Sequence, residues 1–242
     1  QSISAPSLAT VADYAEFANN AALVSGDFHA LADVGQLIIS TNGSLTTFDL
    51  AALEWVGTHL SLISNGNLSS FGTNGLAKLD FIGADLQLAN SFNLGQLSLP
   101  ALLTVGRNVN LDNVTTLTTL SLPQLESIGG DLRVSQVYDL TSINFSALTS
   151  VGGDYSWEQN NSLNYDTGPC ALLDQLTPDG AVTLIKLGVP FTCAPPLVSC
   201  DITMTTTGAN FKGSVQYGDP NLVTWNLDGA VIQSPSVDYN FS

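Results

Sequence analysis

The sequence contains few basic residues, and this scarcity argues against the most common anionic partners. Only five of its 242 residues are Lys or Arg, against 21 Asp and Glu, so the formal net charge is −16 at pH 7. Binding to nucleic acid requires a basic surface that neutralises phosphates. We therefore expect neither nucleic acid nor an anionic bilayer as a partner. The sequence also lacks an apolar run of the roughly 18 residues that a membrane-spanning helix needs, so no membrane span is expected.

Histidine and cysteine are scarce as well, which limits metal and nucleophile chemistry. The histidines are His29 and His59, and the cysteines are Cys170, Cys193 and Cys200. A structural zinc site needs about four Cys or His ligands, and this set does not supply them. The sequence also lacks the Gly-x-Ser-x-Gly, His-Glu-x-x-His and Gly-rich phosphate-loop motifs. We expect a protein that is not an enzyme and that uses no cofactor.

What the sequence does contain is a leucine-rich repeat of about 23 residues. Looser copies begin at Leu45 and Leu68. The most regular copies are Leu94, Leu97, Leu99, Leu102, Val105, Gly106; Leu117, Leu120, Leu122, Leu125, Ile128, Gly129; and Leu140, Ile143, Phe145, Leu148, Val151, Gly152. A period of 20 to 29 residues is typical of solenoids, in which a coil buries its apolar face only against neighbouring coils.

Each repeat predicts two short strands. The leucine run supplies one strand, and the alternating residues after the Gly, such as Leu132 and Val134, supply the other. The coils should therefore build two parallel sheets with strands about 4.8 Å apart. We interpret the repeated glycines as structural, because glycine is favoured where the backbone needs a positive φ or where there is no space for a Cβ.

The whole chain is expected to be mainly β, with about six solenoid coils between two different ends. Val11, Tyr14 and Phe17 recur near helical spacing, which predicts an N-terminal capping helix over residues 7–24. Alternating residues after Asp201, broken by Asp-Gly and Asp-Pro turns, predict antiparallel strands. The expected organisation is a capping helix at 1–26, the solenoid at 27–165, a Cys-containing cap at 166–200 and a β-rich extension at 201–242.

The repeats resemble those of the receptor L-domain and of leucine-rich surface proteins of fungal cell walls. The match covers about residues 10–165 and is best at Leu117–Val134 and Leu140–Tyr155, with Pro100 and Pro123 at the equivalent place. It departs in the missing paired N-terminal cysteines and in the tail after Cys200. The resemblance implies a right-handed parallel β-helix behind an N-terminal helix, and an extracellular setting. It implies no particular ligand, because fold does not fix function.

Other features also indicate secretion. The sequence begins at Gln1, which is consistent with removal of a secretory signal. A disulfide would close the end of the solenoid; we favour Cys170 with Cys193, leaving Cys200 free or bonded to another chain, although the other pairings stay open. Six Asn-x-Ser/Thr sequons are candidate glycosylation sites: Asn42, Asn67, Asn113, Asn144, Asn160 and Asn240.

Alignment of the coils places polar residues in one column before each strand, namely His59, Asp85, Asn108, Asp131 and Asp154. Stacked carboxylates at Asp85, Asp131 and Asp154 could bind Ca²⁺ or act as an acid and base on a polysaccharide. The alternative is that they cap the corner by hydrogen bonds to the backbone two residues further on.

A second column set forms a face of small hydroxyl residues. Its candidate binding residues are Thr46, Thr47, Thr118, Thr119, Thr141 and Ser142, with Ser69, Ser70, Gly95 and Gln96 in the same columns and Asp49, Ser98, Ser121 and Asn144 beside them. Such a face could bind a glycan, another protein or ice, or could be an ordinary solvated strand surface.

These features predict a non-enzymatic extracellular structural or cell-surface protein. We expect it to assemble with its own copies into a glycosylated filament, wall or matrix layer, through its C-terminal extension and its solenoid ends. Glycans or other cell-wall components are further possible partners. The alternative hypothesis is a ligand-binding module that uses the Thr/Ser face.

Overall fold

The computed structural model describes residues 1–72, 75–176 and 178–193, together with the backbone of four C-terminal strands. These strands are β21 (Val198–Cys200), β22 (Lys212–Val215), β23 (Val223–Leu227) and β24 (Ala230–Ser234). The chain divides into two compact units, Gln1–Phe191 and Thr192–Ser242. The division therefore falls inside the region 166–200 that the sequence predicted to be one cap.

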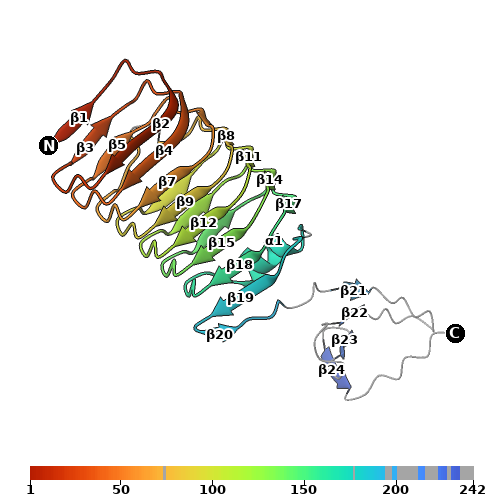
Figure 1. Cartoon of the computed structure of the whole chain (residues 1–242). Coiled ribbons are helices and arrows are strands. Elements are labelled where there is room, and N and C mark those ends of the chain that lie inside the picture. Colours follow the sequence, from red (N-terminus) through yellow and green to blue (C-terminus); the bar gives the residue numbers. More distant parts are fainter. Residues whose placement is uncertain are drawn as a thin grey trace. The chain divides into compact units, whose positions relative to one another are not determined.

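The first unit is a β-solenoid of about eight coils (Figure 1). Each coil contributes one strand to a continuous parallel series that runs along the unit. The series is β2 (Thr10–Ala18), β4 (Asp33–Ser40), β7 (Leu60–Ile63), β9 (Leu86–Ala89), β12 (Val109–Asp112), β15 (Leu132–Ser135), β18 (Tyr155–Glu158) and β19 (Val182–Lys186). The predicted fold class is confirmed, and the predicted number of coils was too low because the first and last coils diverge from the repeat.

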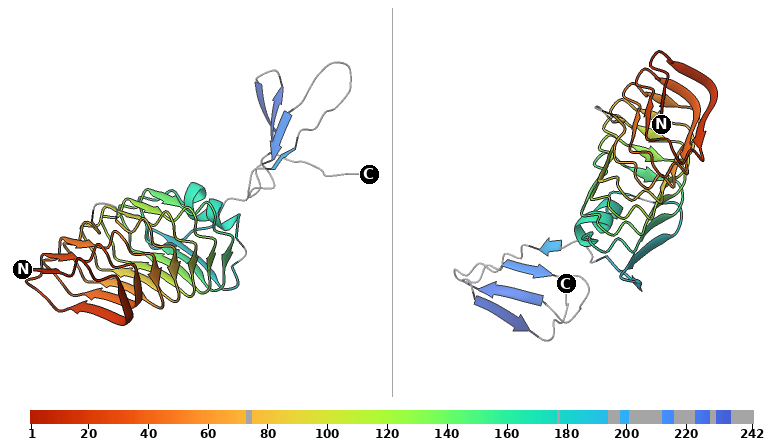
Figure 2. Two further views of the ribbon diagram at one scale, coloured as in Figure 1. Left: turned by 90° about the horizontal axis from the view of Figure 1, so that it is seen from above. Right: turned by 90° about the vertical axis from the view of Figure 1, so that its left-hand side faces the viewer.

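Two further series of strands complete the coils, so the coils that end in β7, β12, β15 and β18 have three strands each rather than the two predicted. One series contains two-residue strands: β6 (Trp55–Val56), β8 (Phe81–Ile82), β11 (Thr104–Val105), β14 (Ser127–Ile128) and β17 (Ser150–Val151). The other contains β1 (Ser2–Ser4), β3 (Ser25–Asp27), β5 (Thr47–Asp49), β10 (Gln96–Ser98), β13 (Thr119–Ser121) and β16 (Ser142–Asn144). Figure 2 shows these series following one another from coil to coil.

The repeated aliphatic residues point inward and lie on top of one another. Leu97 pairs in register with Leu120, and Leu120 with Ile143. Leu97 and Leu120 are buried, whereas Ile143 is half-buried because β16 is the last strand of its sheet. The 23-residue period of the sequence is thus the length of one coil, and it fixes the register of the core.

The repeated glycines are required because the coils lie so close together. A Cβ on Gly83, Gly106, Gly129 or Gly152 would overlap the carbonyl oxygen of the equivalent glycine one coil earlier. The same close approach lets each of these glycines donate its N–H to the preceding coil, as in Gly106 to the Ile82 carbonyl at 2.8 Å. None of the four has a positive φ, so only the steric part of the glycine prediction is confirmed.

The left-handed corners lie instead at residues that are not glycine. Every strand of the continuous parallel series, from β2 to β19, is followed immediately by a residue with φ between 51° and 60°. These residues are Asn19, Thr41, Ser64, Asn90, Asn113, Gln136, Gln159 and Leu187. Polar side chains with local hydrogen-bonding capacity tolerate this region better than β-branched ones, and no sequence pattern had singled out this column.

The predicted N-terminal capping helix is wrong, because residues 10–18 form β2 and pair in parallel with β4. The register of this pair shifts between Val11 and Tyr14, where a β-bulge inserts an extra residue into β2. The bulge separates the core-facing Val11 from the next core-facing residues, Ala15 and Phe17. The helix prediction depended on Tyr14, which faces outward and is 58% exposed, so Val11, Tyr14 and Phe17 do not share one face.

The predicted antiparallel strands of the tail are confirmed in the second unit. Its described strands form one sheet in the order β21-β22-β23-β24, with antiparallel pairing throughout. The first of them begins at Val198, slightly before the predicted start at 201.

We predict that Gly106→Ala lowers the free energy of unfolding by about 1–3 kcal/mol, the usual cost of overpacking, because the added methyl overlaps the Gly83 carbonyl. Urea or thermal unfolding measures the change. Gly95→Ala is the control, because nothing lies within 4 Å of the point that its added methyl would occupy. Equal stability of the two variants would show that the coils do not need this close approach.

We also predict that Gln136→Val lowers the free energy of unfolding by about 1–2 kcal/mol, because a β-branched residue is strained in the left-handed region. Gln136→Asn should be neutral or stabilising by the same measurement. Ser135→Val provides the control one residue earlier, where the backbone is an ordinary strand. If Gln136→Val proved as stable as Ser135→Val, the assigned corner would be contradicted.

Candidate functional site

The predicted Thr/Ser face is the outer surface of the sheets β1-β3-β5 and β10-β13-β16, and we call it the hydroxyl face. Thr119 pairs with Gln96 on one side and with Ser142 on the other, as the coil alignment predicted. An isolated bridge between Thr47 and Ser70 continues the same column. The face also extends further than predicted, because β1 and β3 add serines to it in two earlier coils.

One column of this face is bonded to the solenoid itself. The hydroxyls of Thr46, Ser69, Thr118 and Thr141 each donate to a backbone carbonyl one coil earlier, at 2.9 to 3.2 Å. These donors hold neighbouring coils together and fix the orientation of the side chains. In the next column Thr47, Gln96 and Ser142 are exposed, whereas Ser70 and Thr119 are half-buried. The face is therefore a regular array in which one column of hydroxyl donors is already used.

The acidic column forms a ladder of hydrogen bonds between coils. Asp85 Oδ1 accepts from the backbone N–H of Asn108 at 3.0 Å, and Asn108 Oδ1 accepts from Asp131 N–H at 2.8 Å. Asp131 and Asp154 continue the ladder, the last bond reaching Ala181. The capping interpretation is thus correct in kind, but the bonded N–H lies in the next coil rather than two residues further on.

The other carboxylate oxygens of this column face the side chains of Arg133 and His59. Arg133 lies between Asp131 and Asp154, 3.0 Å from one Oδ2 and 2.8 Å from the other. His59 Nδ1 lies 3.0 Å from Asp85 Oδ2. Among residues 1–72, 75–176 and 178–193, no cluster of three or more His, Cys, Asp or Glu side chains is arranged to hold a metal ion. The carboxylates that were Ca²⁺ candidates are therefore used in capping and ion pairs.

A second ladder, which sequence analysis missed, consists of buried asparagines directly after the left-handed corners. Asn42, Asn65 and Asn160 are fully buried. The side-chain NH₂ of Asn160 donates to the Val134 carbonyl at 2.9 Å, and its Oδ1 accepts from Val137 N–H at 3.0 Å. Asn42 and Asn65 make the corresponding bonds in the early coils. A buried amide can satisfy a donor and an acceptor at once, which an apolar residue cannot.

This burial separates the predicted glycosylation sites into two groups. Asn42 and Asn160 are fully buried and use their amide nitrogens as donors to backbone carbonyls, so a glycan on either is incompatible with this fold. Asn67 and Asn144 are exposed, and Asn113 is half-buried at a left-handed corner. Asn240 lies outside the described residues.

The predicted disulfide agrees with the structure, in which Cys170 and Cys193 are both disulfide-bonded. Cys170 ends a single turn of π-helix, Asp166–Cys170, that leads into the short helix α1 (Ala171–Leu173). The side chain of Cys200 lies outside the described part of the chain.

The C-terminal end of the solenoid is closed by this helical segment and by a hairpin. β20 (Val189–Pro190) turns back antiparallel on β19. Tyr155 donates its hydroxyl to the Pro169 carbonyl at 2.6 Å, and Tyr165 donates to the Ile185 carbonyl at 2.9 Å. Burial raises the pKa of both tyrosines, so they remain neutral donors. The apolar side chains beneath are buried: Trp157, Leu163, Leu172, Leu176 and Leu184.

The N-terminal end is open by comparison. β1 and β2 are the outermost strands of their sheets, and within the described residues no strand pairs with their outer edges. Ile3 is 40% exposed although it lies in the same column as the buried Phe48, and Leu8 is 38% exposed. Tyr14 faces outward, like Gln36 with which it pairs, and is 58% exposed. Inward residues of the later coils, such as Leu37 and Leu60, are fully buried. This end therefore presents both unpaired backbone and uncovered apolar side chains.

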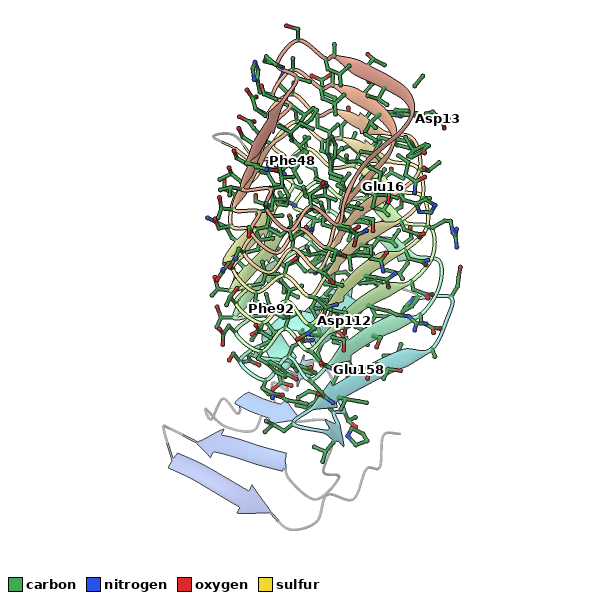
Figure 3. The ribbon with its side chains drawn as sticks, turned by 60° about the vertical axis from the view of Figure 1, so that its left-hand side comes forward. Asp13, Glu16, Phe48, Phe92, Asp112 and Glu158 are labelled. Atoms are coloured by element: carbon green, nitrogen blue, oxygen red, sulfur yellow. The ribbon has the colours of Figure 1, made fainter. Side chains whose placement is uncertain are left out.

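The outer edge of β2 borders a shallow open hollow of about 820 Å³ lined by Asp13, Tyr14, Glu16, Ala18 and Asn20. Figure 3 shows Asp13 and Glu16 along this outermost strand. We refer to β1, β2 and this hollow as the open end. Because the charged side chains that line it, Asp13 and Glu16, are both acidic, it disfavours an acidic partner.

No family model matches the chain, and no curated protein or solved structure is significantly similar to it. Within the described residues, no helix has the length and apolar character needed to cross a membrane.

We predict that Asn160→Ala lowers the free energy of unfolding by about 2–4 kcal/mol, because the buried Val137 N–H and Val134 carbonyl both lose their partner. Asn144→Ala should cost less than about 1 kcal/mol, because this residue is exposed and bonds only to the nearby Ser146 N–H. Chemical unfolding of the two variants provides the comparison. Similar losses would contradict a structural role for the buried ladder.

Proposed function

We propose that this protein is a non-enzymatic, extracellular structural protein whose copies assemble head to tail into a filament or layer at the cell surface. The observation that carries the proposal is the asymmetry of the solenoid, which is open at β1 and β2 and closed at β19 and β20. A contact between two different ends of identical chains is heterologous, and it propagates when its rotation does not close a ring.

The backbone of the open end is suited to strand addition. In a parallel strand, alternate residues direct their N–H and C=O to opposite neighbours. Asn19 donates its N–H to Ser40 in the next coil, so Ala15 and Phe17 also face that coil. Glu16 and Ala18 consequently direct their backbone groups outward. An edge of this kind accepts a strand from another chain.

Further observations support a structural role outside the cell. A disulfide at Cys170 and Cys193 is typical of secreted proteins, and the exposed sequons at Asn67 and Asn144 could carry glycans. The carboxylates of the acidic column hold neighbouring coils together, which favours a scaffold over a catalyst.

The second candidate is a ligand-binding module, and the hydroxyl face is the feature that favours it. The bonds of Thr118 and Thr141 to preceding coils fix a repeating array on which a flat glycan, protein or ice surface could dock. Asn144 lies on the same face, in register with Ser121. A glycan on Asn144 would obstruct such docking.

We predict that the wild-type chain without an N-terminal tag forms polymers, and that Glu16→Pro reduces the polymerised fraction by about tenfold or more. Proline removes the outward N–H of Glu16 and leaves the bonds of Ala15 and Phe17 to β4 in place. Size-exclusion chromatography with light scattering, and negative-stain electron microscopy, measure the polymers. Circular dichroism checks that the solenoid remains folded.

Glu16→Gln is the matched control, because it removes the charge but keeps the N–H, and it should polymerise at least as well as the wild type. A wild-type chain that stays monomeric at every concentration would contradict the proposal and favour the binding module. Equal loss of polymers in both variants would show that the carboxylate, rather than the backbone edge, makes the contact.

A further inference from the structure

We infer that the open end is covered by the C-terminal sheet of a second copy, which lays its apolar face over the first coil. This inference rests on the proposed head-to-tail assembly and identifies the partner surface within it. The surface is the sheet β21-β22-β23-β24.

The register of this sheet separates its residues into two chemically different faces. Cross-strand partners lie on the same face of a sheet, and Trp225 pairs with both Gly213 and Ile232. The face that contains Trp225 carries Val198, Cys200, Gly213, Val215, Val223, Trp225, Leu227, Ala230, Ile232 and Ser234. The opposite face carries Ser199, Lys212, Ser214, Thr224, Asn226, Val231 and Gln233. One face is thus almost wholly apolar and the other almost wholly polar.

A sheet with one apolar face needs a second layer to cover it. The strands described between Thr192 and Ser242 form this one sheet only, and a unit of this size has little material for a core of its own. The open end lacks a cover over its apolar side chains, because Ile3 and Leu8 are exposed. The two surfaces occur once per chain, so each copy offers one of each.

Charge and chain length favour this pairing between copies. Lys212 is the only charged residue in the four strands, so the sheet meets little repulsion from Asp13 and Glu16. Six residues separate Phe191 from Val198, and this connection spans at most about 25 Å. Eight coils place the first and last about 34 Å apart. A connection this short favours contact of the sheet with the first coil of another copy over contact with that of its own chain.

A mixing experiment with two full-length variants tests the inference. Glu16→Pro blocks the open end and keeps the sheet, whereas Trp225→Asp places a charge on the apolar face and keeps the open end. Each variant alone should be monomeric. Their equimolar mixture should form dimers of about 50 kDa, twice the 25.3 kDa of the chain, and no longer species. Thr224→Asp, one residue away on the polar face, should polymerise as the wild type does.

The outcomes separate this inference from the proposed function. Polymers of Trp225→Asp, when Glu16→Pro abolishes them, would overturn the inference and leave head-to-tail assembly intact. Monomers in the mixture would show that the sheet acts only within its own chain, and loss of polymers in Thr224→Asp would show that the effect is not specific to one face; either result overturns the inference. Polymers of both Glu16→Pro and Trp225→Asp would overturn both proposals.

Photo-crosslinking gives an answer that does not depend on the stability of a variant. Tyr14 is the most exposed aromatic residue of the open end and can be replaced by p-benzoylphenylalanine in the full chain. After irradiation of polymers, mass spectrometry should find the crosslink on peptides from residues 198–234 of another copy. Crosslinks on the β19–β20 hairpin, where Leu187 and Val189 are exposed, would instead assign the contact to the solenoid end and overturn the inference.

Discussion

The close stacking of successive coils is the constraint on which the rest of this structure depends. Parallel strands must approach to about 4.8 Å for their backbone groups to bond, and at the glycine column this leaves no volume for a methyl group. Once the backbones are this close, the aliphatic residues of one coil cover those of the next, and each coil obtains a core that it could not form alone. The loss of one glycine would therefore disturb hydrogen bonding and packing together.

The polar side chains of the interior and of the corners serve the same stacking. Asp131 and Asn108 bond to the N–H groups of the next coil, whereas Asn160 bonds to groups of the preceding one. Because each bond joins equivalent positions of two coils, it favours one register and no other. The acidic column and the sequons at Asn42 and Asn160 had each suggested a binding or modification site, and in the structure these side chains bond neighbouring coils to each other.

The two ends of the solenoid differ in how their coils are covered. The last coil is covered by a helical segment, a hairpin and buried aromatic residues such as Trp157 and Tyr165. The first coil has a bare strand edge and exposed apolar residues. Soluble solenoids usually need polar caps at both ends, so an uncapped end is physically reasonable where another molecule completes it.

The sequence by itself determined the solenoid, its coil length and its inward residues. Close stacking requires leucine and glycine at equivalent positions of successive coils, and this requirement produces the visible repeat. It also indicated the hydroxyl face and the disulfide at Cys170 and Cys193. It misplaced β2, because Val11, Tyr14 and Phe17 have a helical spacing although Tyr14 faces outward in the strand. Only the tertiary structure decided which end is open, which asparagines are buried and what the acidic column bonds to. These properties depend on the neighbouring coil, some 23 residues away in the chain, and no local pattern records what lies against a residue at that separation.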